Sequence, residues 1–158
     1  MNSIKKILVC GLNNSGKTTL SIELSKQLHG IHLNADYIRK NLNTDLGFSL
    51  ENRVENARRI GVLADIISNS GYIAIADFIC PVEPCREAFG VNDGDVFVVY
   101  MNTVKPEENE YKDTGKIFTA PKFFDYEVTN FYDSSKMAED VIRELNYVSL
   151  KDRASYTI

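Results

Sequence analysis

The sequence lacks any apolar run near the ~18 residues that a membrane-crossing helix needs, and it carries no basic excess. It has 18 Lys and Arg against 22 Asp and Glu, which gives a net charge of −4. Proteins whose main partner is a nucleic-acid polymer usually carry a basic excess, so we expect neither such a polymer nor a membrane as partner. A small phosphorylated ligand needs only local positive charge and is compatible with this total.

Cysteine is also scarce, and the chain contains no internal repeat or low-complexity linker. The 3 cysteines are odd in number and form no C-x-x-C pair, which predicts buried free thiols rather than disulfides or a zinc site. With 158 residues, 44% of them hydrophobic and 25% charged, the sequence suits one globular domain over residues 1–158. The first residues do not resemble a secretory signal, so we expect a cytoplasmic protein.

The clearest motif is "GLNNSGKTTL" at positions 11–20, which has the spacing G-x-x-x-x-G-K-T. A strand-like run precedes it and a helix-like run follows, as a phosphate-binding loop requires. In such a loop backbone N–H groups face phosphate oxygens, Lys17 reaches the β- and γ-phosphates, and the Thr18 hydroxyl joins the Mg²⁺ shell. The alternative, a turn that only caps a helix, is disfavoured by the spacing and the flanks. The predicted ATP-binding residues are Gly11, Asn13, Asn14, Ser15, Gly16, Lys17, Thr18 and Thr19.

Apolar strand candidates alternate with helical patterns, which predicts β-α-β units around a parallel sheet. The expected fold is α/β, a three-layer P-loop NTPase sandwich whose central parallel sheet has about five strands. The predicted strands are residues 4–10, 30–34, 72–77, 96–101 and 126–130. The predicted helices are residues 17–28, 36–41, 51–69, 84–89 and 135–145. In the third of these helices Ser49 is the expected N-cap, with Asn52 in the N3 position.

Polar residues that directly follow the predicted strands are the candidates for chemistry, because ligands of open α/β sheets bind at the carboxyl ends of the strands. Asp36 is the first candidate for the catalytic base or Mg²⁺-linked carboxylate, and Lys17 is its cationic partner. Asp77 is the second, since it ends an apolar strand where a Walker-B-type acid would stand. The alternative for Asp36 is that it caps the following helix. The predicted metal ligands are Thr18, Asp36 and Asp77.

The helix predicted over residues 51–69 and the polar segment after residue 102 supply further candidates. Arg53 and Asn56 are three residues apart and share a helix face, so they could clamp one ligand, although an Arg on a helix is ordinarily a solvated charge. Residues 103–120 are polar and charged. They are interpreted as a mobile lid, with an exposed loop as the alternative.

Three stretches together, "GLNNSGKTTL", "LNADYIRKNLNTDLGFSLENRVENARRIG" and "DFICP", resemble the adenylylsulfate kinase family. The resemblance covers most of residues 5–90. It implies an ATP-dependent kinase that phosphorylates the 3′-hydroxyl of adenosine 5′-phosphosulfate, with Mg²⁺, in sulfate assimilation, and it implies a homodimer. By position, the resemblance implies that Asp36 is the catalytic and Mg²⁺-associated acid and that Phe48 stacks on the purine of the acceptor. The substrate-binding positions that it implies are Arg39, Phe48, Arg53, Asn56, Ile79, Cys80 and Phe118.

The sequence also departs from that family's pattern. Asn34 stands at an Asp position and Asp77 at a small-residue position, Cys80 replaces a serine, and Glu83 replaces an arginine. The lid is shortened, although "EYKDTGKIFTAP" keeps Phe118 together with two lysines, Lys112 and Lys116, that could close over phosphates. These departures keep the kinase chemistry and leave the acceptor open.

Three hypotheses follow. The leading one is an adenylylsulfate kinase or a close relative that acts on an anionic, nucleotide-like small molecule. The second is a kinase of the same family that phosphorylates another nucleotide-like or small hydroxyl acceptor, which the shortened lid and Glu83 favour. The third is a nucleotide-binding module without turnover. The intact Lys17, Thr18 and Asp36 argue against that module.

Overall fold

The computed structural model describes residues 3–109 and 111–155, and its side-chain detail ends at residue 149. The strands are β1 (Lys6–Gly11), β2 (Ile31–Asn34), β3 (Ala74–Phe78), β4 (Val96–Met101) and β5 (Tyr126–Val128). The helices are α1 (Lys17–Leu28), α2 (Ala35–Asn41), α3 (Leu50–Asn69), α4 (Glu83–Phe89), α5 (Lys112–Ile117) and α6 (Ser134–Ser155). Two short 3₁₀ turns are η1 (Val91–Asp93) and η2 (Pro106–Glu108).

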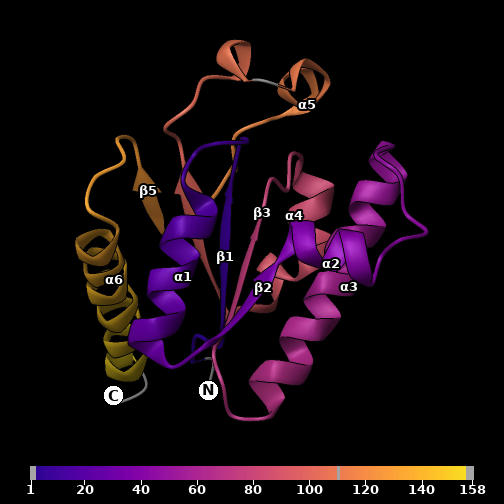
Figure 1. Cartoon of the computed structure of the whole chain (residues 1–158). Coiled ribbons are helices and arrows are strands. Elements are labelled where there is room, and N and C mark those ends of the chain that lie inside the picture. The colour runs from indigo at the N-terminus through magenta and orange to yellow at the C-terminus, as the bar shows by residue number, and fades with distance from the viewer. Residues whose placement is uncertain (1–2, 110, 156–158) are drawn as a thin grey trace.

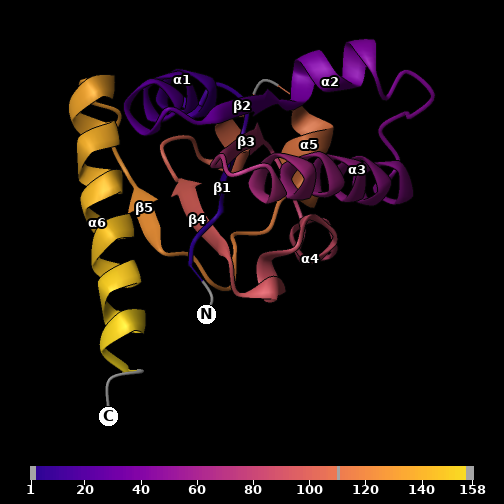
Figure 2. The same ribbon diagram turned by 90° about the horizontal axis from the view of Figure 1, so that it is seen from below.

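The five strands form one sheet in the order β2-β3-β1-β4-β5, and all four neighbouring pairs are parallel. Helices α1 and α6 cover one face, and α3 and α4 cover the other (Figures 1 and 2). The predicted α/β sandwich with a five-stranded parallel sheet is therefore confirmed. Every residue of β1, β3 and β4 is buried, as expected for parallel strands that are covered on both faces.

Two apolar clusters, one on each face, hold the layers together. The cluster under α1 and α6 contains Leu20 and Val141, and the cluster under α3 and α4 contains Ile60 and Phe89. Helix α3 lies especially close to α4, because a Cβ on Gly61 would come within 2.6 Å of the Phe89 carbonyl oxygen. This packing fixes α3, and with it the side chains that the helix directs toward the carboxyl ends of the strands.

Most of the predicted elements are found within a few residues of the expected bounds. Ser49 is the N-cap of α3, and its side chain accepts a hydrogen bond from the Asn52 N–H, as predicted. Two elements differ. The last helix continues to Ser155 rather than stopping at 145, and the predicted lid contains a short helix, α5, that the sequence analysis did not expect. Residue 110 of that lid lies outside the described residues.

The three cysteines are buried free thiols, as predicted. Burial raises the pKa of the Cys10 thiol to about 11, so this thiol stays protonated at neutral pH. Within the described part of the chain, no helix combines the length and the apolar character that a membrane crossing requires.

Candidate active site

One cleft of about 1250 Å³ lies across the carboxyl ends of the strands. It is lined by the phosphate loop, by the start of α2, by the first turns of α3, by the segment after β3 and by residues 111–114 of the lid. Figure 1 shows α5 above the carboxyl ends of the strands, and the first residues of α5 line the cleft. The parallel topology thus brings together the segments that the sequence analysis singled out separately.

The phosphate loop has the backbone that its glycines permit. Gly11 (φ 147°), Asn14 (φ 62°) and Gly16 (φ 96°) all have positive φ. A Cβ on Gly11 would come within 2.5 Å of the Met101 carbonyl oxygen, so a side chain there is excluded on steric grounds. Gly11 and Ser15 are buried beneath the loop, and the other predicted ATP-binding residues line the cleft.

Lys17 is a partly buried cation of the cleft. Its ammonium donates a hydrogen bond to the Leu12 carbonyl oxygen at 2.6 Å, so it lies over the loop. Burial lowers the pKa of Lys17, while the negative charges of Asp77 and Asp36 raise it again. The two carboxylates offset part of the free-energy cost of desolvating the ammonium group. The phosphate oxygens of a bound triphosphate would stabilise its charged form further.

Asp36 lies in the first turn of α2 and is exposed to the cleft. The N-cap of α2 is Asn34, whose side-chain oxygen accepts a hydrogen bond from the Tyr37 N–H at 2.9 Å. The alternative that Asp36 serves only as a helix cap is therefore wrong. Because another residue satisfies the helix terminus, the Asp36 carboxylate is left to face a ligand.

Asp77, at the end of β3, is the second carboxylate of the cleft and is only 3% exposed. The Asn34 amide nitrogen lies 3.3 Å from Asp77 Oδ1 and 3.4 Å from Thr18 Oγ1, so it connects two of the three predicted metal ligands. Among the described residues, no group of three or more His, Cys, Asp or Glu side chains could hold a metal. The hydroxyl and two carboxylates are nevertheless the hard oxygen donors that fit Mg²⁺ arriving with phosphates.

Two guanidinium groups lie close to one aromatic ring in the half of the cleft that α2 and α3 line. The Arg39 guanidinium carbon lies 4.6 Å from the centre of the Phe48 ring, and that of Arg53 lies 5.6 Å from it. Arg39 donates to the Gly47 carbonyl oxygen, and Arg53 donates to the Phe48 carbonyl oxygen and to Thr114 Oγ1 in the lid. Burial lowers the pKa of Arg39, and the like charge of Arg53 lowers it further, so this half of the cleft favours an anion.

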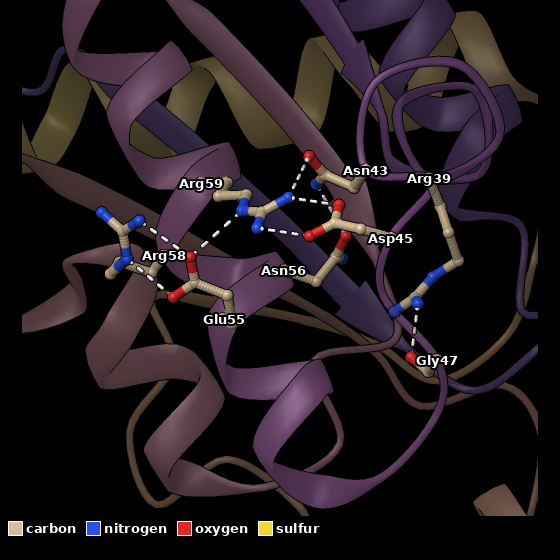
Figure 3. A network of polar contacts seen from close by, with 8 residues as sticks. All are labelled: Arg39, Asn43, Asp45, Gly47, Glu55, Asn56, Arg58 and Arg59. Carbon is tan, nitrogen blue, oxygen red and sulfur yellow. Dashed lines mark hydrogen bonds and ion pairs between the residues drawn. The ribbon is translucent and has the colours of Figure 1, made fainter.

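Arg58 and Arg59 are not among the residues that line the cleft, and both form ion pairs with acidic neighbours (Figure 3). Arg58 pairs with Glu55, and Arg59 pairs with both Glu55 and Asp45, so their charges are already compensated on the surface. Asn56 is 3% exposed and lines the cleft, and its side-chain oxygen accepts a hydrogen bond from the Asn43 amide at 2.9 Å. The predicted common face of Arg53 and Asn56 is therefore found at the cleft.

Ile79 and Cys80 also line the cleft, and Cys80 has a positive φ of 46°. Phe118 does not follow its predicted role, because it belongs to the core. It is 9% exposed and lies against Tyr100, with ring centres 6.2 Å apart. The ring lies at the C-cap of α5 and is not among the residues that line the cleft.

The reversed charge at Glu83 is also compensated. Glu83 forms an ion pair of 2.9 Å with Arg86, which is 1% exposed and donates to the Thr119 carbonyl oxygen at the end of the lid. The Thr119 N–H in turn donates to the Pro81 carbonyl oxygen at 2.8 Å. Glu83 thus helps to anchor the lid. The i, i+3 spacing of Glu83 and Arg86 on α4 could have indicated this pair, although it was not predicted from the sequence.

Several cleft residues were not predicted as site residues. Lid residues Tyr111, Asp113 and Thr114 line the cleft, as does Lys40 on α2. Of the two lid lysines, Lys112 lines the cleft. The positions of the lid residues depend on how the segment around α5 folds over the strands, which no local motif in the sequence signals.

Comparison with known proteins adds an independent observation. A family model described as adenylylsulphate kinase matches residues 4–139. An adenylyl-sulfate kinase of Staphylococcus haemolyticus (strain JCSC1435) is 40% identical over 108 residues, which cover 63% of this chain and 54% of the relative. Adenylyl-sulfate kinase 3 of Arabidopsis thaliana is 38% identical over 105 residues, 61% of this chain and 50% of the relative. The chain thus spans about half the length of these relatives.

Solved structures share the fold. The APS kinase CysC of Mycobacterium tuberculosis, in complex with AMPPNP and APS, has a TM-score of 0.76 at 22% identity, over 92% of this chain and 99% of that chain. A gluconokinase of Sinorhizobium meliloti 1021 has a TM-score of 0.72 at 10% identity, over 99% of both chains. Because such different kinases share it, the fold alone does not select the acceptor.

Proposed function

Because the chain belongs to the adenylylsulphate kinase family, as the match over residues 4–139 shows, we propose that it transfers the γ-phosphate of ATP to the 3′-hydroxyl of adenylylsulfate. The observation that carries this proposal is one cleft that is lined both by the phosphate loop and by the Phe48 ring, with the guanidinium groups of Arg39 and Arg53 close to that ring. A flat purine can stack on the aromatic ring, and guanidinium groups bind phosphate and sulfate oxygens.

On the donor side, the backbone N–H groups of the phosphate loop and the Lys17 ammonium would hold the triphosphate. Thr18, Asp36 and Asp77 would hold Mg²⁺ together with phosphate oxygens, and the ion would neutralise charge on the transferred group. Lys17 already interacts with the negative charges of Asp77 and Asp36, so its charge is in place before the nucleotide binds. Positioned charges of this kind stabilise the transition state without reorganisation during the reaction.

On the acceptor side, Asp36 would orient the attacking hydroxyl and accept its proton. Arg39, Arg53 and Asn56 would fix the anionic end of the acceptor. Arg53 also reaches Thr114 on the lid, so acceptor binding and lid position are coupled through one side chain. The lid helix then excludes water, which would otherwise compete with the hydroxyl as the phosphate acceptor.

Replacement of Arg53 by alanine tests the acceptor assignment. Hydrogen bonds to charged groups contribute about 1.5–3 kcal/mol, so Arg53→Ala should raise the KM for adenylylsulfate about tenfold to a hundredfold. The KM for ATP should change little, because the hydrogen bonds of Arg53 go to Phe48 and Thr114 and not to the phosphate loop. Initial-rate kinetics with each substrate varied in turn measures both.

The matched control is Arg58→Ala on the same helix. Arg58 is 56% exposed in its side chain and pairs only with Glu55 among the ion pairs of the described residues, so its loss should leave both KM values within about twofold. An Arg53→Ala protein with an unchanged KM for adenylylsulfate would remove Arg53 from the acceptor site and weaken the proposed substrate.

A further inference from the structure

The strand pair β2–β3 ends in two side chains that face each other, Asn34 and Asp77. They are partners in the parallel register, so both occupy the carboxyl edge of the sheet at the same level. The Asn34 amide nitrogen lies 3.3 Å from Asp77 Oδ1 and 3.4 Å from Asp77 Oδ2. Figure 1 shows β2 and β3 side by side, next to the strand that leads into the phosphate loop. The two side chains therefore form a pair between different strands beside the donor site.

The orientation of the Asn34 amide is fixed by a third contact. Its oxygen accepts the Tyr37 N–H at the start of α2, so its nitrogen must face the opposite way. On that side it meets both Asp77 and the Thr18 hydroxyl, 3.4 Å away. The Asn34 amide thus connects the Asp77 carboxylate on β3 to the Thr18 hydroxyl.

The surroundings of Asp77 show why an amide stands opposite it. The Asp77 side chain is 1% exposed, and the His32 ring nitrogen Nε2 lies 3.2 Å from its Oδ1. Asp77 is also one of the two carboxylates whose charge raises the pKa of Lys17. A second carboxylate at position 34 would face Asp77 at about hydrogen-bond distance, and two like charges so close together destabilise one another.

We propose that Asn34 and Asp77 act as one matched amide–carboxylate pair. In this pair, Asp77 at the carboxyl end of β3 supplies the carboxylate that binds the metal of the bound nucleotide. Asn34 is the positioning residue that holds this carboxylate beside Thr18. The proposal rests on the nucleotide site of the proposed function, but it does not depend on the identity of the acceptor.

The pair can be tested by exchanging its members. We compare the unchanged protein with Asp77→Asn, Asn34→Asp and the double exchange, and we use Asn92→Asp as a control. Asn92 is exposed in η1, before β4, so this change adds a negative charge far from the cleft. The affinity for Mn²⁺ in the presence of ADP, measured by electron paramagnetic resonance, and the thermal midpoint are recorded for each protein.

Asp77→Asn should weaken Mn²⁺ binding about tenfold to a hundredfold, the usual loss when a residue that holds or orients a metal is removed. Asn34→Asp should lower the thermal midpoint without metal, because it places two carboxylates face to face. The double exchange should bind Mn²⁺ within about threefold of the unchanged protein, since the same pair re-forms in reverse and a carboxylate at position 34 can still cap α2. Asn92→Asp should match the unchanged protein.

Two results would overturn the proposal. In one, Asp77→Asn lowers the thermal midpoint but binds Mn²⁺ with ADP as the unchanged protein does, which would make the pair a structural tie between β2 and β3. In the other, the folded double exchange binds Mn²⁺ no better than Asp77→Asn does. If the double exchange does not fold, the metal affinity of Asp77→Asn decides alone. Because none of these measurements uses adenylylsulfate, a different acceptor would leave their outcome unchanged.

Discussion

Replacement of Lys17 by alanine is expected to abolish turnover, with a loss of kcat of about a thousandfold or more. The ammonium lies on the phosphate loop, beside two carboxylates and within hydrogen-bond distance of the Leu12 carbonyl oxygen. Without it, the charge that builds up on the transferred phosphoryl group loses its nearest protein cation. Single-turnover assays with ATP and adenylylsulfate would measure the loss.

Lys26→Ala is the control for this experiment, because Lys26 lies on the same helix and its side chain is 68% exposed. It should keep full activity. The thermal midpoint of Lys17→Ala must also be measured, since the change removes the cation near Asp36 and Asp77. A folded Lys17→Ala protein with full activity would contradict the assignment of the donor site.

The second large effect is expected for Asp36→Asn, which should lower kcat about a hundredfold to ten-thousandfold, the usual contribution of a positioned general base. The affinity for ATP should fall much less, because the backbone of the phosphate loop and Lys17 remain. Asp36 is exposed to the cleft and is not needed as a helix cap, so the amide should not disturb α2. Pre-steady-state rates and nucleotide binding by calorimetry separate the two quantities.

Glu51→Gln provides the matched control, because Glu51 is the acid in the first turn of α3, as Asp36 is in α2. This change should lower the free energy of unfolding by only about 0.3–1 kcal/mol, because it removes the interaction of an acidic side chain with the helix dipole. It should leave kcat unchanged. Equal values of kcat for Asp36→Asn and for the unchanged protein would remove Asp36 from the chemistry.

The phosphate loop could be located from the sequence because it is a local feature. The glycines, the lysine and the threonine of residues 11–18 lie within one turn and the start of one helix, and each has a backbone or charge role that its spacing reveals. The buried strands were likewise visible as continuous apolar runs. For the same reason Asp36 and Asp77 could be placed at the cleft from the positions of the strand ends alone.

The lid could not be predicted in the same way. Helix α5 has only 6 residues, it includes Gly115, and its buried positions are Thr114 and Gly115. A sequence pattern with so little apolar content does not indicate a helix, and tertiary contacts decide it instead: a Cβ on Gly115 would come within 2.5 Å of the Pro106 carbonyl oxygen. The placement of Phe118 could not be predicted for a related reason, because an aromatic residue in a polar segment can either stack on a ligand or fill the core. Only the position of Tyr100 beneath it distinguishes the two.

The Asn34–Asp77 pair and the Glu83–Arg86 pair show a further limit of sequence analysis. Asn34 and Asp77 were each noted as departures from the family pattern, but their contact depends on the register of β2 against β3. Glu83 was interpreted as an added negative charge beside the site, whereas Arg86 pairs with it beneath the lid. In both pairs, the electrostatic effect of one residue depends on the residue that it contacts.

The most direct test of the proposed function is the release of ADP from Mg-ATP by the purified protein, measured with and without adenylylsulfate. The account predicts slow release without the acceptor and a large acceptor-dependent increase, with one 3′-phosphorylated product formed for each ADP. If the protein binds ATP but adenylylsulfate does not stimulate ADP release, adenylylsulfate is not the acceptor and the proposed function is wrong.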